Sequence, residues 1–471
     1  MSGAHKMEKK ILLIVPPTKA FYKNAKIRTA AHFSPFLAPA VLGAVLLEQG
    51  FAVRVFDFNI YESGDELFLK ELGCFNPDYA GVTFTTPLFG EMNRICQMIK
   101  WYDKKICIIG GGAHCSSFPE DTLKHSDLDV VIIGEGDWTL ARIIAGEDKE
   151  GIDGIAWRKG DEILLNLKDG FIKDLDNLPF PAWQLYDIKK YATTRVLSRK
   201  SPAGWIETSR GCVFACTYCN KSVFGQTFRV KCPRRVVDEM EYMLRAGFRE
   251  IHIADDGFTT DIKRAKAICD EIIYRRLKFP WAPVAGLRVD RVDDELLNKM
   301  RRAGCYRIYF GIESGNQKVI DRIKKGITLD EVRKAVKLCK KNKLEVYGFF
   351  MLGLPGDTEK TIQDTIDFAK ELGLDMAKAS IATPLPATDW FNELESLGLI
   401  KSNDWTKLNL YVPSREIFDH PTLKWETIEK YMDKFYRDFY FRPVFIIKRF
   451  FKSLISGNLL SDIRDFFRTK W

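Results

Sequence analysis

Short apolar segments alternate with longer amphipathic stretches along most of the chain, and this alternation predicts two α/β regions. In the first region, residues 8–145, the pattern predicts a helix at 39–49 and buried strands at 10–15, 51–56, 79–84, 106–109 and 129–133. Strands of this kind are typical of a parallel sheet with helices on both faces. Such sheets bind ligands at the carboxyl ends of their strands, where Gly110-Gly-Gly112 and Gly134-Glu-Gly136 fall.

The second region, residues 196–400, repeats the alternation. Strands are expected at 205–208, 250–254, 283–286, 307–311, 345–351 and 376–382. Six strands with intervening helices predict a partial (β/α)6 barrel of the TIM type, whose active site lies at the carboxyl ends of the strands. Residues 146–195 contain a possible hairpin and a stiff Leu178-Pro-Phe-Pro181 connector, and we expect them to form a linker.

Residues 401–471 are expected to be helical, amphipathic and basic. From Arg442 to Trp471 the chain has seven basic residues and two acidic ones, and it contributes much of the total charge of +9. Two interpretations stay open for 445–455: the helix lies on an anionic membrane surface, or its apolar stripe packs on the barrel with the charges facing water. Nucleic acid is not expected, since the aromatic and basic residues follow a helical stripe rather than a stacking platform.

The chain has eleven cysteines, no secretory signal in its first residues, and no apolar run near the roughly 20 residues that span a bilayer. These features favour thiols or metal ligands in a reducing compartment over disulfides. We therefore expect a cytoplasmic protein, with peripheral membrane contact as a further possibility.

The strongest chemical signal is Cys212-Val-Phe-Ala-Cys216-Thr-Tyr-Cys219. Thiolates hold iron–sulfur clusters, and three ligands on a four-iron cluster leave one iron open to another ligand. The segment follows an expected barrel strand and so falls at the catalytic edge. A structural zinc site with Cys232 as fourth ligand is the alternative, but zinc sites use paired cysteines with a distant second pair.

At these residues the sequence resembles the radical S-adenosylmethionine (SAM) superfamily, whose signature has three cysteines and an aromatic residue in the place of Tyr218. The resemblance implies that the cysteines hold a 4Fe-4S cluster, that SAM chelates the open iron, and that reduction releases a 5'-deoxyadenosyl radical. Similar segments follow at the expected strand ends, although Ala387 stands where the family has glycine. They imply SAM contacts by Tyr218, Asp255, Asp256, Glu313, Ser314 and Gly353.

The first region resembles the cobalamin-binding domain that precedes the barrel in one branch of this superfamily, the class B radical SAM methyltransferases. The similar segments are 35–50, 110–120 and 129–136. Asn59 stands where other cobalamin proteins have the histidine that ligates cobalt, so no imidazole is expected on the lower face. The resemblance implies a cobalamin site at Thr83, Thr85, Gly110, Gly111, Gly112, His114, Gly134 and Glu135.

The resemblance implies a cobalamin-dependent radical SAM enzyme, and we expect it to C-methylate an unactivated carbon of a small or lipid-like metabolite. A flavodoxin or ferredoxin is the expected reductant. Rearrangement, cyclisation or carbon–carbon coupling without methyl transfer stays open. So does RNA methylthiolation, which needs a second cluster on three further cysteines. A catalytically silent corrinoid-binding or scaffolding protein is the third alternative.

Overall fold

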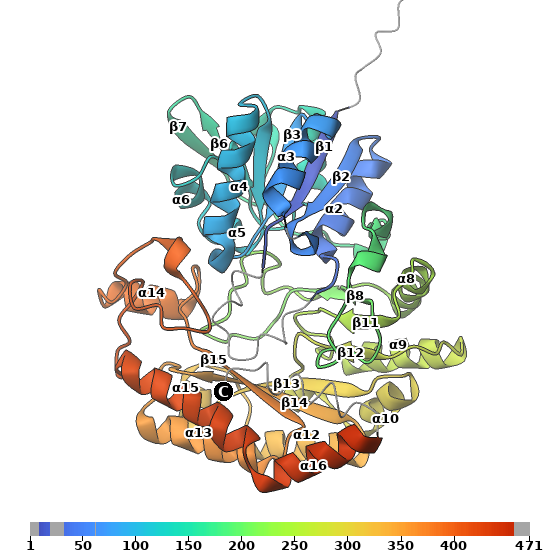
Figure 1. Ribbon diagram of the computed structural model, residues 1–471, viewed down its shortest axis with the longest axis vertical. Helices are drawn as coiled ribbons and strands as arrows, with labels where there is room; N and C mark the ends of the chain where they lie inside the picture. Colours follow the sequence, from blue (N-terminus) through green and yellow to red (C-terminus); the bar gives the residue numbers. More distant parts are fainter. Residues whose placement is uncertain (1–8, 19–32, 62, 456–471) are drawn as a thin grey trace, which may run out of the picture.

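The computed structural model describes residues 9–18, 33–61 and 63–455. Two α/β units are stacked along the long axis of the molecule (Figure 1). The amino-terminal unit lies at the top of this view, and the strands β8 to β15 form the unit below it. The α/β class, with an amino-terminal layered unit and a central strand–helix unit, is as predicted.

The amino-terminal unit is built on a seven-stranded sheet in the order β2-β1-β3-β4-β5-β6-β7. Its first five strands are parallel, as predicted. The strands are β1 (Lys10–Val15), β2 (Ala52–Asp57), β3 (Tyr79–Thr83), β4 (Cys107–Gly111), β5 (Val130–Ile132), β6 (Ile155–Lys159) and β7 (Glu162–Asn166). Helices α2 (Leu37–Glu48), α3 (Gly64–Phe75), α4 (Phe89–Tyr102), α5 (Ala113–Ser117), α6 (Pro119–Lys124) and α7 (Asp137–Ala145) accompany them.

The amino-terminal sheet continues beyond residue 145, into the segment that was expected to be a linker. Strands β6 and β7 form an antiparallel hairpin that continues the sheet, with Ile155 opposite Ile132 and Trp157 opposite Val130. Ile155 and Trp157 are buried in the same core as β1 and β4, so burial of these side chains fixes the hairpin to the sheet. Only the chain after Asn166 connects the two units.

The second unit is an open arc of six parallel strands with helices outside. The strands are β8 (Ala203–Ile206), β11 (Glu250–Ile253), β12 (Trp281–Pro283), β13 (Arg307–Glu313), β14 (Glu345–Leu352) and β15 (Met376–Ile381). They form two three-stranded sheets, which isolated bridges join at Trp281 to Cys305 and at Leu287 to Phe310. The intervening helices are α8 (Pro233–Arg245), α9 (Ile262–Tyr274), α10 (Asp294–Arg302), α11 (Gln317–Arg322), α12 (Leu329–Lys341) and α13 (Glu359–Glu371). The predicted partial (β/α)6 barrel is confirmed.

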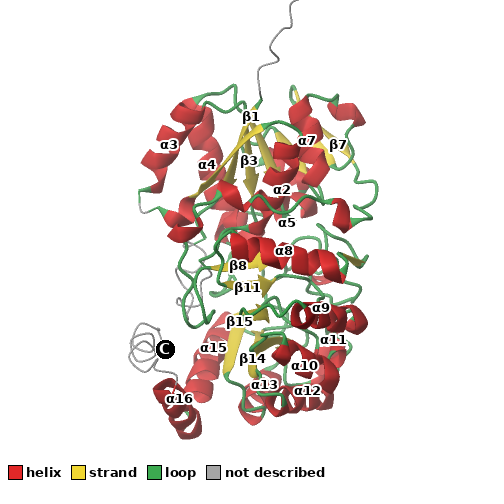
Figure 2. Ribbon diagram, turned by 90° about the vertical axis from the view of Figure 1, so that its right-hand side faces the viewer, coloured by secondary structure: helices red, strands yellow, loops and turns green. Residues whose placement is uncertain are grey.

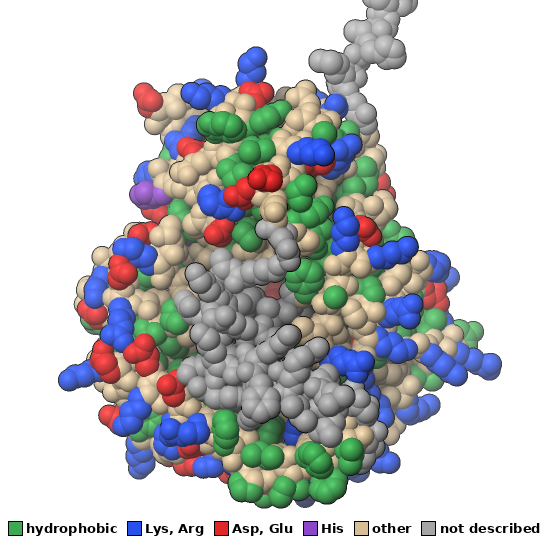
Figure 3. Space-filling model, in the orientation of Figure 1, with side chains coloured by type: hydrophobic (Ala, Val, Ile, Leu, Met, Phe, Trp, Pro, Cys, Tyr) green, Lys and Arg blue, Asp and Glu red, His purple; other side chains and the backbone are tan. Residues whose placement is uncertain are grey.

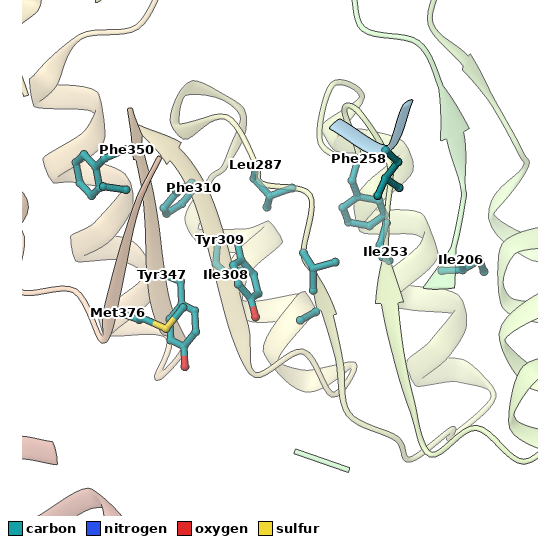
Figure 4. Close-up of a cluster of buried hydrophobic side chains, with 14 of the residues drawn as sticks. Ile206, Ile253, Phe258, Leu287, Ile308, Tyr309, Phe310, Tyr347, Phe350 and Met376 are labelled. Carbon is teal, nitrogen blue, oxygen red and sulfur yellow. The ribbon is translucent and has the colours of Figure 1, made fainter. Parts of the chain in front are cut away.

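One cluster of buried apolar side chains runs through this arc, from Ile206 on β8 to Met376 on β15 (Figure 4). The rings of Tyr309 and Tyr347 pack edge to face on adjacent strands with centroids 5.1 Å apart. This continuous core makes the strand ends a rigid base for the loops above them.

The carboxy-terminal region is less helical than predicted. Helix α14 (Asp389–Ser396) is followed by a mostly irregular segment up to α15 (Trp425–Tyr440) and α16 (Pro443–Ile455). Helix α15 covers the edge of the arc, where the Tyr436 and Tyr440 hydroxyls donate to the carbonyls of Ala379 and Ala377 on β15. Residues 456–471, also expected to be helical, lie outside the described residues.

Candidate active site

The three-cysteine loop leaves the arc through a short antiparallel pair, β9 (Ser209–Arg210) with β10 (Arg229–Val230). Gly211 opens the loop with φ +85°, and a Cβ there would lie 1.9 Å from the carbonyl oxygen of Thr227. Only glycine fits this left-handed position against another backbone segment. The sequence Arg-Gly-Cys therefore sets the direction in which the loop leaves the barrel.

Cys212, Cys216 and Cys219 line one cavity of about 390 Å³ at the strand ends. Burial and, to a smaller extent, the neighbouring Cys216 and Cys212 raise the pKa of the Cys219 thiol to about 12, so the three sulfurs lie close together. Within the described ranges, no three His, Cys, Asp or Glu side chains are placed to hold a single metal ion. In a cubane each thiolate binds a different iron, so three thiols around one cavity fit a four-iron cluster.

Tyr218 links the loop to the end of β13 through Lys325. The Lys325 ammonium donates to Glu313 Oε1 at 2.9 Å and to the Tyr218 hydroxyl at 3.3 Å. Glu313 has φ +68° at a register shift in β13, a bulge that turns its carboxylate into the cavity. A Cβ at Gly311 would lie 2.7 Å from that carboxylate, which explains the glycine. Buried charge and strained backbone in one place are typical of a binding site.

Of the two aspartates after β11, only Asp256 lines the cavity. Burial raises its pKa, and the adjacent Asp255 raises it further. Asp255 is buried and accepts hydrogen bonds from the Thr208 amide and the hydroxyls of Thr208 and Ser209. It fixes the end of β8 and does not face the cavity, contrary to its predicted contact with SAM.

Ser314 and Gly353 also lie outside the cavity lining. The Ser314 hydroxyl is buried against Thr365 Oγ1 at 3.1 Å and accepts from the Asn316 amide. The Gly353 amide donates to Asp357, and its carbonyl accepts from His420. Both residues shape the loops behind the site, and on β14 it is Phe349, Phe350 and Met351 that line the cavity.

Several lining residues were missed by the sequence analysis. Lys378 and Ser380 lie two residues apart on β15 and both face the cavity. Polar residues at every second position of a strand share one face, so the sequence of this strand could have predicted them. The Arg288 guanidinium lies 3.7 Å from the ring centroid of Phe214 in the cysteine loop. Tyr411 comes from the irregular carboxy-terminal segment, and its position has no sequence signal. Other lining residues that the sequence analysis missed include Arg291, Lys325, Phe349, Met351 and Leu410.

A second cavity, of about 260 Å³, lies at the carboxyl ends of β1, β3 and β4 between α2 and α7. Six predicted residues line it, namely Thr83, Gly110, Gly111, Gly112, Gly134 and Glu135. A Cβ at Gly111 would meet nothing within 4 Å, so this backbone faces open space. Gly112 has φ +107°, and a Cβ there would lie 2.5 Å from the Phe84 carbonyl oxygen. A narrow apolar slot with open backbone fits the aromatic base of a nucleotide-like ligand.

Thr85 and His114 do not line this slot. Thr85 is exposed, whereas His114 is completely buried among the rings of Phe84, Phe89 and Trp405. Burial lowers the pKa of His114 to about 4, so the imidazole is neutral, with Nδ1 3.2 Å from the Thr86 hydroxyl. His114 packs the carboxy-terminal segment against the amino-terminal unit and does not line the slot.

Asn59, in the place of the cobalt-ligating histidine, is buried with its amide fully hydrogen-bonded. Its oxygen accepts from the Thr18 amide and hydroxyl, both at 2.7 Å, and its nitrogen donates to the Pro16 carbonyl and to Asp57. The Tyr191 hydroxyl donates to the same Asp57. These bonds occupy the amide, so Asn59 has no lone pair or proton left for a cofactor.

A buried ion network joins the two units beside the second cavity. Arg210 donates to Glu135 and twice to Asp137 at 2.8–2.9 Å, and to Glu207 at 2.7 Å. Arg229 donates to both oxygens of Glu135. Burial raises the pKa of Asp137, but the Arg210 charge outweighs this and holds that pKa below its usual value. Glu135 is thus an ion-pair partner that borders the cavity.

The segment between Gly211 and Gly225 lines both cavities. Its cysteines face the first cavity, and Val223 and Phe224 face the second. Asn220, next to Cys219, donates to the Ser117 hydroxyl on α5 and to the Pro386 carbonyl beyond β15. The two sites are therefore adjacent and are held in register by one loop.

A three-thiol loop at the mouth of a parallel strand arc, with a glycine-lined slot beside it in a second α/β unit, defines a radical SAM enzyme with a corrinoid-type domain. Residues 206–369 match the radical SAM superfamily, and residues 27–144 match the B12 binding domain. An uncharacterized methyltransferase of Pyrococcus horikoshii is 31% identical over 94% of this chain and 95% of its own length. The chain belongs to the cobalamin-binding branch of the radical SAM superfamily, and it is a radical SAM enzyme whose cofactors are a 4Fe-4S cluster, SAM and cobalamin.

Other similar proteins carry different reactions in their names. Cytidylyl-2-hydroxyethylphosphonate methyltransferase of Streptomyces wedmorensis is 28% identical over 91% of this chain and 90% of its own length. Anaerobic magnesium-protoporphyrin IX monomethyl ester cyclase of Rubrivivax gelatinosus is 26% identical over 83% of this chain and 71% of its own. The fold resembles the radical SAM methyltransferase TsrM from Kitasatospora setae, solved with cobalamin and a [4Fe-4S] cluster, with a TM-score of 0.69 at 20% identity, covering 84% and 76% of the chains.

Proposed function

We propose that this enzyme transfers a methyl group to an unactivated carbon of a small or lipid-like substrate. The observation that carries the proposal is the loop between Gly211 and Gly225, whose two halves line the two cavities. A substrate carbon bound between the two cavities would be close to both cofactors, and a reaction that uses both cofactors requires this proximity.

Within this proposal Cys212, Cys216 and Cys219 hold the cluster, and its open iron takes up SAM. Asp256, Glu313 and Tyr218 then contact SAM, with Lys325 neutralising Glu313. Asp255, Ser314 and Gly353 support the same loops from behind. The bound cofactors supply a carbon-centred radical and a transferable methyl group. The apolar wall of Phe349, Met351 and Leu410 excludes water from such a radical.

The slot lined by Gly110, Gly111 and Gly134 would take the nucleotide tail of cobalamin, with Thr83 and Gly112 at its mouth. Because the Asn59 amide is saturated by protein groups, the cofactor would bind without a side-chain ligand from this position.

The test uses holoenzyme purified anaerobically with hydroxocobalamin supplied. We expect one cobalt and roughly four irons per chain, and we expect SAM to yield both 5'-deoxyadenosine and S-adenosylhomocysteine under strong reductant with an acceptor present. Replacing the three cysteines together by alanine should abolish the brown chromophore and the 5'-deoxyadenosine. Cys232→Ala is the matched control, since Cys232 is an exposed helix cap outside the cavity.

The same measurements separate the alternatives. Formation of 5'-deoxyadenosine without S-adenosylhomocysteine would favour cyclisation or rearrangement, which the cyclase among the relatives makes the second candidate. Roughly eight irons would favour RNA methylthiolation. Cys96 and Cys115, however, are buried among apolar side chains of the amino-terminal unit. No SAM cleavage by cluster-loaded protein would support a silent scaffold and overturn the proposal.

The reductant is proposed to be a flavodoxin or ferredoxin. A lipid-like substrate would agree with peripheral contact between the enzyme and a membrane surface. No helix among the described residues is long and apolar enough to cross a bilayer.

A further inference from the structure

Helix α16 presents its apolar side chains outward. It contacts α15 through Phe445, whose ring lies 5.3 Å from Phe439 and 5.2 Å from Tyr440. The opposite face carries six large apolar side chains that are 47–65% exposed, namely Val444, Ile446, Ile447, Phe450, Phe451 and Leu454. The interpretation in which this stripe packs on the barrel is therefore wrong.

These side chains form one surface patch. Figure 3 shows hydrophobic side chains gathered along the lower edge of the molecule, where Figure 1 places α16, and Figure 2 shows the helix at the margin of the barrel unit. Six of the eighteen exposed large apolar side chains in the described residues lie on this one helix. Contiguous patches of this kind mark contact with a membrane or a protein partner.

The sequence of the helix carries basic residues and no acidic ones. Between Arg442 and Ile455 the chain has four basic residues and no acidic one. Lys448 is exposed and lies near the Lys340 ammonium at the end of α12. Burial lowers the pKa of Lys340, Asp375 raises it, and the Lys448 charge lowers it further, so the two ammonium groups repel each other. A surface that brings negative charge would relieve this repulsion.

We propose that α16 is the docking site of this enzyme for an anionic membrane surface. The helix has 13 residues, which extend about 20 Å. That length cannot span the roughly 30 Å hydrocarbon core but suits a helix that lies in the interface with its apolar face inserted. Lys448 at the edge of the apolar face then lies at the level of the lipid headgroups.

A second copy of the chain fits this face less well. An isologous pair would place the same face on both sides of the interface, so Lys448 and its neighbours would approach their own copies without an acidic residue between them. A lipid surface supplies the missing negative charge and accepts the apolar side chains together.

Docking through α16 leaves the cofactor cavities free. The helix lies at the end of the molecule remote from the amino-terminal unit (Figure 1). The first cavity lies at the carboxyl ends of the barrel strands, and the second is lined by residues of both units. The inference does not depend on the proposed reaction, and substitutions on α16 are expected to leave the iron content and SAM cleavage unchanged.

The experiment is co-sedimentation of the full-length holoenzyme with vesicles of phosphatidylcholine alone, or mixed with an equal amount of phosphatidylglycerol. We expect binding to the mixed vesicles that weakens as salt is added. Phe450→Ser with Phe451→Ser should lower the partition coefficient at least about tenfold, since two half-exposed rings are lost. Lys448→Glu should lower it roughly tenfold, because an attraction becomes a repulsion. The control is Trp101→Ser with Leu167→Ser, two apolar residues on α4 and just after β7 that are more exposed than Phe450 and Phe451, and this variant should bind as the wild type does.

Three results would overturn the inference. One is that wild-type holoenzyme does not sediment with the anionic vesicles. Another is that the control variant loses binding as strongly as the α16 variants do. The third is a wild-type dimer in analytical ultracentrifugation that the Phe450 and Phe451 substitutions dissociate, which would assign the face to a second copy.

Discussion

Replacing Arg210 by methionine tests the buried ion network that joins the two units. The substitution keeps the length and apolar stem of the side chain but removes the guanidinium that donates to Glu135, Asp137 and Glu207. Arg229 still pairs with Glu135, but Asp137 and Glu207 lose their cation in a site where all these side chains are nearly inaccessible. Leaving a buried carboxylate without its partner costs about 3–5 kcal/mol.

The loss of stability in the Arg210→Met variant should depend on pH. In the wild type Arg210 holds the pKa of Asp137 below its usual value, so this pair stabilises the fold above the pKa of the unfolded carboxyl. In the variant, burial acts without that charge and raises the carboxyl pKa values. The deficit in the free energy of unfolding should therefore be largest at about pH 8 and should narrow toward about pH 5, where the buried carboxylates take up protons.

Urea unfolding followed by tryptophan fluorescence and far-ultraviolet circular dichroism measures both effects. Arg142→Met is the matched control, because Arg142 on α7, the helix that carries Asp137, also pairs with two carboxylates, but at the surface. It should cost no more than about 1 kcal/mol. A loss for Arg210→Met as small as that of the control, or a deficit that does not change with pH, would refute the account of the network as a buried clamp.

Three further predictions follow from other residues of the two sites. Electron paramagnetic resonance of the reduced cobalamin in the holoenzyme should show no coupling to an axial nitrogen, because the Asn59 amide is saturated by Thr18, Pro16 and Asp57; a resolved nitrogen coupling would contradict this. Lys325→Met should weaken SAM binding, measured by equilibrium dialysis, by about tenfold or more, because Glu313 loses its partner while the cysteines are untouched; unchanged affinity would remove Glu313 and Lys325 from the SAM site. Burial raises the pKa of Asp357 to about 6, against hydrogen bonds from Thr361, Leu354 and Gly353 that lower it. The Asp357 carboxyl ionises at a lower pH in the unfolded chain than in the folded one. The free energy of unfolding of the wild type should therefore fall by about 3 kcal/mol relative to that of Asp357→Asn as the pH rises from about 4 to about 6. Parallel stability curves for the two proteins would rule this out.

The sequence by itself determined the elements and the chemistry that depends on residues close together in the chain. Strand and helix alternation placed all the strands of the arc to within a few residues, since each apolar run must be buried between helices. The three cysteines lie within one loop, so their spacing alone defined a cluster-binding site on one cavity. Gly110, Gly111 and Gly134 lie at strand ends of a parallel sheet, and such ends meet at one edge in every fold of this kind.

Only the tertiary structure decided which side chains face the cavities and which support them from behind. Asp255 and Asp256 are neighbours, yet one fixes β8 while the other faces the cavity, because successive side chains at a strand end point to opposite sides. His114 is buried by Trp405, a residue that lies far along the chain and that no local pattern connects to it. The orientation of α16 was equally undetermined, since a helical stripe has the same period whether it faces the core or the solvent. Only the packing of Phe445 against Phe439 and Tyr440 on α15 shows that the other apolar side chains face outward.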